Sequence, residues 1–130
     1  MDAVNPTRAA WWTTLYDEHL ADVLLDAADP AETEATAAFL LRELRVSPGD
    51  RLFDQCCGTG RVAVALARRG YRVHGVDLIA RYVERARDAA AGVEPAPTFV
   101  ADDALTGQQI VNLSQQLLNF CIRGDRIDIV

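Results

Sequence analysis

The sequence contains no lysine, so its 13 cationic residues are all arginine, and 19 acidic residues outnumber them. The formal net charge is −6 at pH 7. Proteins that bind the phosphate backbone of nucleic acids usually carry a basic surface, and this composition does not favour one. We therefore expect a small-molecule substrate and no nucleic-acid partner.

Long apolar stretches and a cysteine framework are also missing. No apolar run approaches the roughly 20 residues that a membrane-spanning helix needs, and the first residues do not resemble a secretory signal peptide. The three cysteines, Cys56, Cys57 and Cys121, have neither the spacing of metal ligands nor that of a disulfide framework. These absences predict a soluble, cytoplasmic protein with no membrane contact, no bound metal and reduced cysteines.

The stretch from Arg51 to Asp77 predicts a strand, a glycine turn, a helix and a second strand. Bulky apolar residues after Arg51 run into Gly58-Thr59-Gly60, which is typical of a buried strand that meets a tight turn. Helix-forming residues fill positions 61–69, and Gly70 follows where a C-terminal cap belongs. Alternating apolar residues then predict the second strand, over 71–77.

Two strands joined by so short a helix imply a right-handed crossover in a parallel α/β sheet with helices on both faces. Ligands of such sheets bind at the carboxyl ends of the strands. The glycine turn falls at that end, together with Asp54 after the first strand and Asp77 after the second. The sequence therefore predicts a cofactor site at this edge.

The charge of Asp54 separates two classes of cofactor. In a dinucleotide site, Gly58-x-Gly60-x-x-Ala63 would hold a pyrophosphate at the helix N-terminus and Asp77 would hold a ribose hydroxyl. Asp54 would then repel the phosphates, because like charges about 4 Å apart cost roughly 4 kcal/mol at an intermediate dielectric. S-adenosylmethionine carries ammonium and sulfonium charges and no phosphate. Asp54 therefore favours S-adenosylmethionine over NAD.

Three segments resemble the motifs of class I S-adenosylmethionine-dependent methyltransferases, in the family's order and spacing. Asp54-Gln55-Cys56-Cys57-Gly58-Thr59-Gly60 resembles the first motif, and His74-Gly75-Val76-Asp77 resembles the second. Phe99-Val100-Ala101-Asp102-Asp103-Ala104 is similar to the third. Cys56 departs from the glycine or alanine that the family often has there. The resemblance implies a Rossmann-like fold and methyl transfer.

The resemblance also implies roles for the motif residues. Asp54 and the backbone of Cys56–Gly60 would face the methionyl part of the cofactor. Asp77 would bind the ribose hydroxyls, Leu78 would pack against the adenine, and Asp103 would accept from the adenine amine. The cofactor-binding candidates are Asp54, Cys56, Gly58, Thr59, Gly60, Asp77, Leu78, Asp102, Asp103 and Ala104. No residue is identified as a general base, so the catalytic residues stay unassigned.

An N-terminal helical cap over residues 1–46 is expected to precede the cofactor-binding core at 47–130. An amphipathic helical pattern covers about 9–28, with its apolar residues on one face. In the family such an addition commonly covers the cofactor and shapes the substrate pocket. The aromatic candidates for this lid are Trp11, Trp12 and Tyr16, and the alternative is that they are plain core residues.

Further helices and strands follow from caps and breakers. Asp29 is expected to cap a helix that has Pro30 at its first position and ends near Leu44. A helix over about 79–91 and a third strand over 98–101 come next. Three arginines of that helix, Arg81, Arg85 and Arg87, are expected to form a solvated face.

The composition changes after the third motif, since six of the eight Gln and Asn residues fall between Gln108 and Asn119. Residues 127–130 then resemble the family's fourth strand, which lies beside the first, so we expect about four strands in the order 3-2-1-4. The family's sheet is larger, and the chain is expected to be truncated after this strand. Its apolar edge favours a homodimer.

Three functions stay open from the sequence, one of them that of a fragment of an NAD-type oxidoreductase, which the charge of Asp54 disfavours. In the first, the chain carries the cofactor-binding half of an S-adenosylmethionine-dependent methyltransferase that acts on a small molecule. In the alternative, it is a non-catalytic S-adenosylmethionine-binding module, or a pseudoenzyme that needs a partner chain. The methyl acceptor and the origin of the unusual tail are not determined by the sequence.

Overall fold

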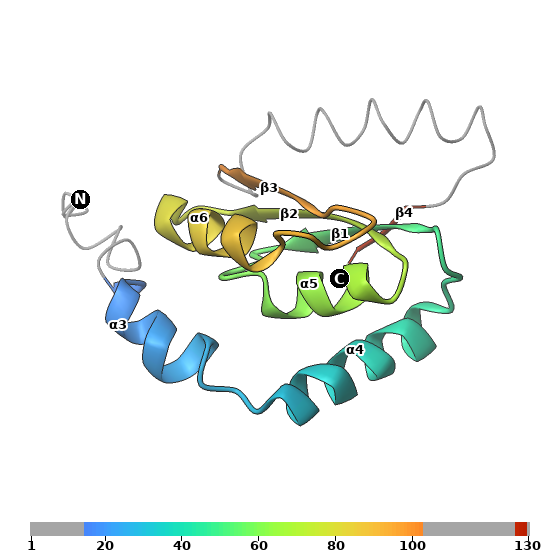
Figure 1. Ribbon diagram of the computed structural model, residues 1–130, viewed down its shortest axis with the longest axis horizontal. Helices are drawn as coiled ribbons and strands as arrows, with labels where there is room; N and C mark the ends of the chain where they lie inside the picture. Colours follow the sequence, from blue (N-terminus) through green and yellow to red (C-terminus); the bar gives the residue numbers. More distant parts are fainter. Residues whose placement is uncertain (1–14, 103–126, 130) are drawn as a thin grey trace, which may run out of the picture.

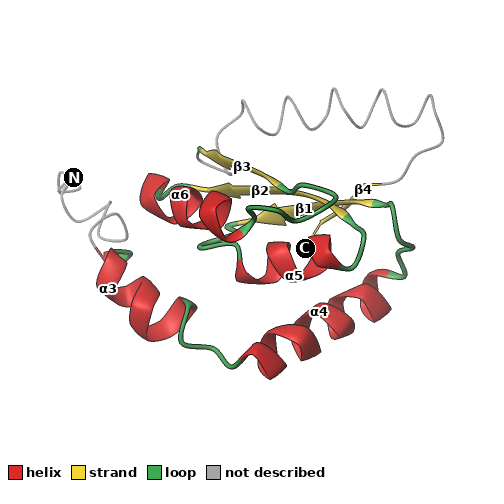
Figure 2. Ribbon diagram, viewed as in Figure 1, coloured by secondary structure: helices red, strands yellow, loops and turns green. Residues whose placement is uncertain are grey.

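The computed structural model describes residues 15–102 and 127–129. Its helices and strands alternate along the chain and build one layered α/β unit (Figure 1, Figure 2). The elements are α3 (Glu18–Leu20), η1 (Ala21–Leu25), α4 (Pro30–Leu44), β1 (Arg51–Gln55), α5 (Arg61–Arg68), β2 (Arg72–Asp77), α6 (Ala80–Ala89), β3 (Thr98–Ala101) and β4 (Ile127–Ile129).

The sheet is parallel, with the strand order β3-β2-β1-β4. Leu52 lies opposite Val73 of β2 on one side and opposite Asp128 of β4 on the other. Gly75 of β2 lies opposite Phe99 of β3. The predicted Rossmann-like α/β class and the predicted order 3-2-1-4 are confirmed.

One apolar cluster joins the sheet to its helices. The strands contribute Leu52, Val73 and Phe99, each at most 4% exposed. The members from the helices are Ala37 of α4, Ala63, Val64, Ala65, Leu66 and Ala67 of α5, and Val83 and Ala86 of α6. Five consecutive residues of α5 are buried, and three of them are alanines. Their small side chains let this helix approach the sheet closely.

The three long helices lie on the same face of the sheet, because all of them contact this one cluster (Figure 2). Successive crossovers from β1 to β2 and from β2 to β3 run in the same direction, so right-handed connections place α5 and α6 on one side. A second helical layer is not among the residues that the structure describes. The expected helices on the other face stay a prediction.

Helix α4 begins and ends as its sequence predicts. The Asp29 carboxylate accepts a hydrogen bond from the backbone N–H of Ala31 at 2.9 Å, and Pro30 fills the first helical position. The helix ends at Arg45, which has a left-handed backbone with φ of 54°. Its placement beside α5 leaves its N-terminus near the glycine loop.

The N-terminal segment differs from the expected continuous helix. Within the described residues it forms the short α3, capped by the Asp17 side chain, and then the π-helical η1. Its apolar side chains are largely exposed, at 41% for Tyr16 and 53% for Val23, whereas Ala21 is buried. Few of its apolar side chains are therefore buried, and its acidic residues pair with arginines of α6. The boundary predicted between cap and core stays a prediction.

None of the described helices combines the length and the apolar character that crossing a membrane requires.

Candidate functional site

The loop between β1 and α5 holds three residues in a left-handed backbone conformation. Cys56, Gly58 and Gly60 have φ values of 59°, 58° and 80°. Glycine adopts this conformation without steric cost, whereas a residue with a Cβ atom loses about 1–2 kcal/mol. The position at which Cys56 departs from the family's first motif is therefore one where a glycine is physically favoured, and this strain was not visible in the sequence.

Backbone hydrogen bonds hold the loop against β2. The N–H of Cys57 donates to the carbonyl of Val76 at 3.0 Å, and the N–H of Gly58 donates to Asp77 Oδ2 at 2.8 Å. The other carboxylate oxygen of Asp77, Oδ1, accepts from the N–H of Ile79 at 2.9 Å. Asp77 therefore fixes both the glycine loop and the start of α6. Each of its oxygens keeps one further lone pair, so the expected contact with a ribose stays a prediction.

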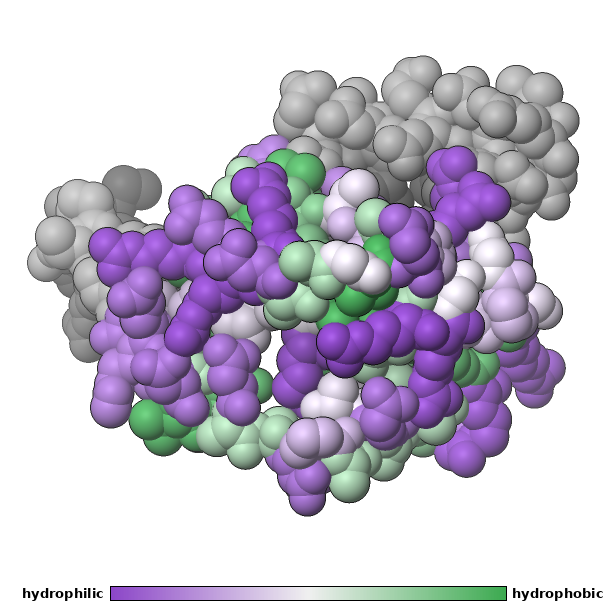
Figure 3. Space-filling view, in the orientation of Figure 1, coloured by the Kyte–Doolittle hydropathy of each residue, from purple (hydrophilic) through white to green (hydrophobic). Residues whose placement is uncertain are grey.

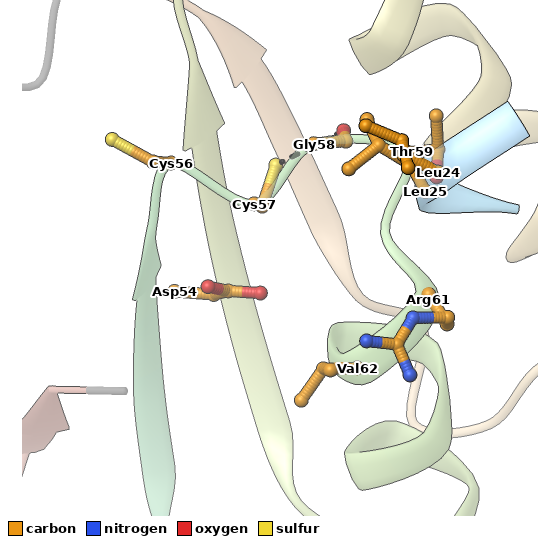
Figure 4. A pocket seen from close by; sticks show the side chains of 9 residues that line it. All are labelled: Leu24, Leu25, Asp54, Cys56, Cys57, Gly58, Thr59, Arg61 and Val62. Atoms are coloured by element: carbon orange, nitrogen blue, oxygen red, sulfur yellow. Dashed lines mark hydrogen bonds between the residues drawn. The ribbon is translucent and has the colours of Figure 1, made fainter. Parts of the chain in front are cut away.

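Asp54 lies beside this loop in a different environment. Its residue is only 8% exposed, and its side chain points from β1 into a cavity (Figure 4). Within residues 15–102 no hydrogen bond to its carboxylate is found. Burial, and after it the charge of Asp77, raises the pKa of Asp54 to about 7. A cation in the cavity would counter both effects, because it stabilises the ionised carboxylate.

The cavity has a volume of about 230 Å³, is open to solvent on one side, and is bordered by β1, the glycine loop, α5 and η1. Pockets for whole ligands usually measure about 300–1,000 Å³, so this space fits one end of a nucleoside-sized molecule. Its lining residues are Leu24, Leu25, Asp54, Cys56, Cys57, Gly58, Thr59, Arg61 and Val62.

Both cysteines of the loop are free thiols, as the sequence predicts. Burial, together with the charges of Asp54 and Asp77, raises the pKa of Cys57 to about 12, so this thiol stays protonated near neutral pH. Cys56 is exposed, and its side chain points away from the other residues of the site (Figure 4). In the described part of the chain, no group of three or more His, Cys, Asp or Glu side chains could hold a metal ion.

The N-terminal segment closes one side of the cavity. Leu24 and Leu25 of η1 line it, and Thr59 Oγ1 donates a 2.6 Å hydrogen bond to Asp26 Oδ1 at the end of η1. Tyr16 is 41% exposed and is not one of the lining residues. The other two lid candidates, Trp11 and Trp12, lie outside the described residues. A lid role for the three aromatic residues stays a prediction.

The second and third motifs meet at the ends of β2 and β3. The N–H of Asp102 donates to the carbonyl of Asp77 at 3.0 Å, so the chain after β3 begins beside Asp77. Leu78 follows Asp77 and is 44% exposed, which leaves its side chain accessible to a ligand. Asp103 and Ala104 lie outside the described residues.

Two residues at the site were not found from the sequence. Asp26 contacts the loop through Thr59, and Arg85 of α6 pairs with Asp22 and with Asp26. Arg85 was expected on a solvated face, and the structure corrects this. The signal was present in the spacing of four between Glu18, Asp22 and Asp26, which places acids on one helical face. Its partner on α6 could not be identified without the fold.

Arg87 was also expected on a solvated face, and it is exposed; in addition it donates from Nη2 to the carbonyl of Phe99 at 2.7 Å and so ties α6 to β3. Arg61 donates from Nη1 to Thr33 Oγ1 at 2.8 Å and links α5 to α4 behind the cavity. These contacts fix the helices that carry the site.

Similar proteins are found by sequence and by fold. The curated relatives include an uncharacterised RNA methyltransferase of Enterococcus faecalis, 27% identical over 90 residues, which are 64% of this chain and 20% of the relative. A second is the S-adenosyl-L-methionine-dependent Diels-Alderase iccD of Talaromyces variabilis, 45% identical over 51 residues, which are 39% of this chain and 18% of the relative.

Among solved structures, the magnesium protoporphyrin IX methyltransferase of Synechocystis PCC 6803 with bound S-adenosylmethionine is similar. It is 29% identical, with a TM-score of 0.50, and the match covers 60% of this chain and 39% of that one. The matched part is thus about a fifth of these curated relatives and under half of this structure.

The family comparison covers the site itself. Residues 52–117, half of the sequence, match the family model described as a methyltransferase domain. This stretch contains β1 except for its first residue, and also the glycine loop, α5, β2, α6 and β3, which are the elements that surround Asp54 and Asp77. The motif resemblance, the parallel sheet and the family match agree, and the chain belongs to the methyltransferase domain family.

Proposed function

We propose that the chain binds S-adenosylmethionine at the glycine loop and carries the cofactor-binding half of a methyltransferase. When bound, this cofactor supplies an electrophilic methyl group on a sulfonium, whose positive charge is lost in the transfer. The chain's own residues would hold the cofactor's amino-acid end near Asp54 and its ribose near Asp77. Leu78, exposed at the end of β2, would lie against the adenine.

The observation that carries this proposal is the buried carboxylate of Asp54. Asp54 is 8% exposed, and burial and the charge of Asp77 raise the pKa of its carboxyl group to about 7, so a cation beside it would stabilise the ionised form. Leu24, Leu25, Val62 and loop backbone line the other sides of the cavity together with Arg61, whose Nη1 donates to Thr33 and not to Asp54. We therefore infer that the ligand brings the positive charge beside Asp54. An ammonium group does so, whereas a pyrophosphate would place like charges beside Asp54 and Asp77.

Calorimetric titration tests this binding with matched ligands and variants. S-adenosylmethionine should bind the wild type, and NAD should give no detectable heat. Asp54→Asn keeps the shape of the side chain and removes its charge, and it should weaken binding by about tenfold or more, because hydrogen bonds to charged groups contribute about 1.5–3 kcal/mol. Asp88→Asn, which removes an exposed acid of α6, should bind like the wild type. Equal affinity in both variants, or tighter binding of NAD, would contradict the proposal.

The proposed methyl acceptor is a small molecule. The named action of the magnesium protoporphyrin relative supports this choice, as do the apolar side chains at the cavity wall and the excess of acidic residues. Transfer of label from S-adenosylmethionine to a panel of phenols, amines and carboxylic acids is the direct assay. An RNA included in the panel would test the alternative that the RNA methyltransferase relative represents.

A second candidate is a protein that binds S-adenosylmethionine without transferring its methyl group. The Diels-Alderase relative, 45% identical over 51 residues, favours this alternative because its name joins the same cofactor to a cycloaddition. In that case the binding experiment would give the same result, and the labelled methyl group would stay on the cofactor.

We further propose a cytoplasmic location and a homodimer formed through the free edge of β4. Localisation of a tagged chain within cells tests the first.

A further inference from the structure

The N-terminal segment and α6 carry opposite charges at the same spacing. Glu18, Asp22 and Asp26 lie four residues apart, as do Arg81 and Arg85. Residues four apart lie on one helical face, so the two rows can meet. They do: Arg81 Nη1 lies 3.9 Å from Glu18, Arg85 Nη2 contacts Asp22, and Arg85 Nη1 lies 3.3 Å from Asp26. Hydrophilic side chains accordingly gather over α3 and α6 in Figure 3.

Asp26 differs from the other two acids because it also contacts the glycine loop. Its Oδ1 accepts from Thr59 Oγ1 at 2.6 Å, and its Oδ2 faces Arg85. Thr59 is 6% exposed and lies between Gly58 and Gly60. A continuous chain of polar contacts therefore runs from α6 through Asp26 to the loop at the cavity.

The two links of this chain differ in strength. The side chains of Arg85 and Asp26 are 35% and 41% exposed, so the ion pair alone stabilises by at most about 1 kcal/mol. The bond from Thr59 is shorter, at 2.6 Å, and partly buried, and a hydrogen bond to a carboxylate is stronger than one between neutral groups. Nη1 of Arg85 is buried and makes no hydrogen bond within the described residues, so the carboxylate of Asp26 is its charged neighbour.

We propose that Arg85 is a positioning residue for ligand binding. It orients Asp26, which in turn holds Thr59, so that α6 fixes the glycine loop and the η1 wall of the cavity together. Without it, the loop must be ordered when the ligand binds, and that cost lowers the affinity. The ligand in the test is S-adenosylmethionine, so this part rests on the proposed function.

Arg81 is the matched control for Arg85. Each alanine variant removes one arginine from α6 together with its ion pairs to the N-terminal segment, which are one for Arg81 and two for Arg85, but only Arg85 is connected to the loop, through Asp26. Arg85→Ala should weaken S-adenosylmethionine binding by at least about fivefold, the low end of measured couplings between sites. Arg81→Ala should stay within about twofold of the wild type, as expected for an exposed pair.

Hydrogen exchange of the loop gives a readout that needs no ligand. In the free protein, the amides of residues 56–60 should exchange faster in Arg85→Ala and at the wild-type rate in Arg81→Ala. Thr59→Val removes the hydroxyl at nearly constant shape and should behave like Arg85→Ala. Thr59→Ser keeps the hydroxyl and should behave like the wild type. The double variant Arg85→Ala with Thr59→Val should be little worse than either change alone, because both break the same chain.

The outcomes separate the two proposals. If Arg85→Ala and Arg81→Ala match in both affinity and loop exchange, the positioning role is wrong. Should the wild type bind no S-adenosylmethionine, the proposed function fails, and loop exchange still decides the role of Arg85. If Arg85→Ala does not fold, the loop exchange of Arg85→Lys and of the two Thr59 variants tests the positioning role instead. Equal loop exchange in Thr59→Val and Thr59→Ser would overturn the proposal.

Discussion

At the scale of single residues, Asp54 and Asp77 are two carboxylates that end neighbouring strands and behave differently. Asp77 accepts two backbone hydrogen bonds, whereas Asp54 is buried beside it and accepts none within the described residues. The sequence indicated that both acids would meet at the glycine loop. From the sequence we expected Asp54 to carry a fixed negative charge. Its pKa of about 7 means instead that the carboxyl group is partly protonated near neutral pH unless a cation lies beside it.

This pKa predicts a pH-dependent stability that Asp54→Asn should remove. The pKa is 3.8 in the unfolded chain and about 7 in the folded one, so the folded state binds more protons between these values. The stabilisation is complete below pH 3.8 and is lost as the pH rises through about 7. At about 1.36 kcal/mol per pKa unit, the loss amounts to about 4 kcal/mol.

Urea unfolding of wild type and variant at a series of pH values checks this prediction. The difference in the free energy of unfolding isolates Asp54, because the other titrating groups are common to both proteins. Asp54→Asn should gain stability relative to the wild type as the pH rises from about 5 to about 8. A difference that stays constant with pH would show that Asp54 has an ordinary pKa in the folded protein.

At the scale of elements, two glycines set how closely the strands and helices approach. A methyl group at Gly75 of β2 would lie 2.7 Å from Phe99 Cδ1 and 3.0 Å from Cys57 Cβ. One at Gly60 would lie 2.8 Å from Ala86 Cβ on α6. Gly75, the glycine of the second motif, is therefore required for packing, because a larger side chain would clash with Phe99 of β3 and with Cys57 of the loop.

Gly75→Ala should destabilise the fold by about 1–3 kcal/mol, the usual cost of overpacking a core. Its backbone φ is not in the left-handed region, so this cost is steric. Because the Cβ of Cys57 is one of the clashing atoms, ligand affinity should fall as well. Thermal unfolding and calorimetric titration measure the two effects.

Gly92→Ala is the matched control for this substitution. Gly92 has a φ of 75° and no atom within 4 Å of an added methyl group, so the change costs about 1–2 kcal/mol of backbone strain and leaves the cavity unaltered. Unchanged stability of Gly75→Ala, or an equal loss of affinity in both variants, would contradict the packing role.

The accuracy of the sequence analysis differs between elements for a physical reason. β1, β3 and α4 were found because local signals determine them: apolar strand residues, the breakers around them, and the cap of Asp29. The N-terminal segment was assigned a continuous helix because it has helical periodicity. Its contacts with α6 are charged and depend on the fold, so its break at Asp17 and the pairing of Arg85 could not be predicted.

The candidate site shows the same division. Its backbone part, from the glycine loop to Asp77, follows from the motif spacing, because parallel strands bring their ends together. The wall formed by Leu24 and Leu25, and the hydrogen bond from Thr59 to Asp26, join segments more than 30 residues apart. Such contacts are set by tertiary packing, which periodicity does not encode.

At the scale of the whole molecule, the described sheet ends in two edge strands, β3 and β4. β4 pairs with β1 through Ile127–Ile129, and its other edge has no partner strand within the described residues. Parallel strands are usually interior to a sheet, and an unpaired edge exposes N–H and C=O groups that can pair with another chain. A second copy of this chain is one partner that such an edge can pair with.

We therefore predict a concentration-dependent dimer, measured by light scattering as a rise toward twice the monomer mass. Successive residues of a strand direct their N–H groups to opposite sides, so Asp128→Pro and Ile129→Pro remove donors from different edges of β4. One of them should weaken the pairing with β1 and lower stability, and the other should abolish dimerisation with little loss of stability. A monomer at high protein concentration would exclude this interface, and so would dimers that survive both substitutions.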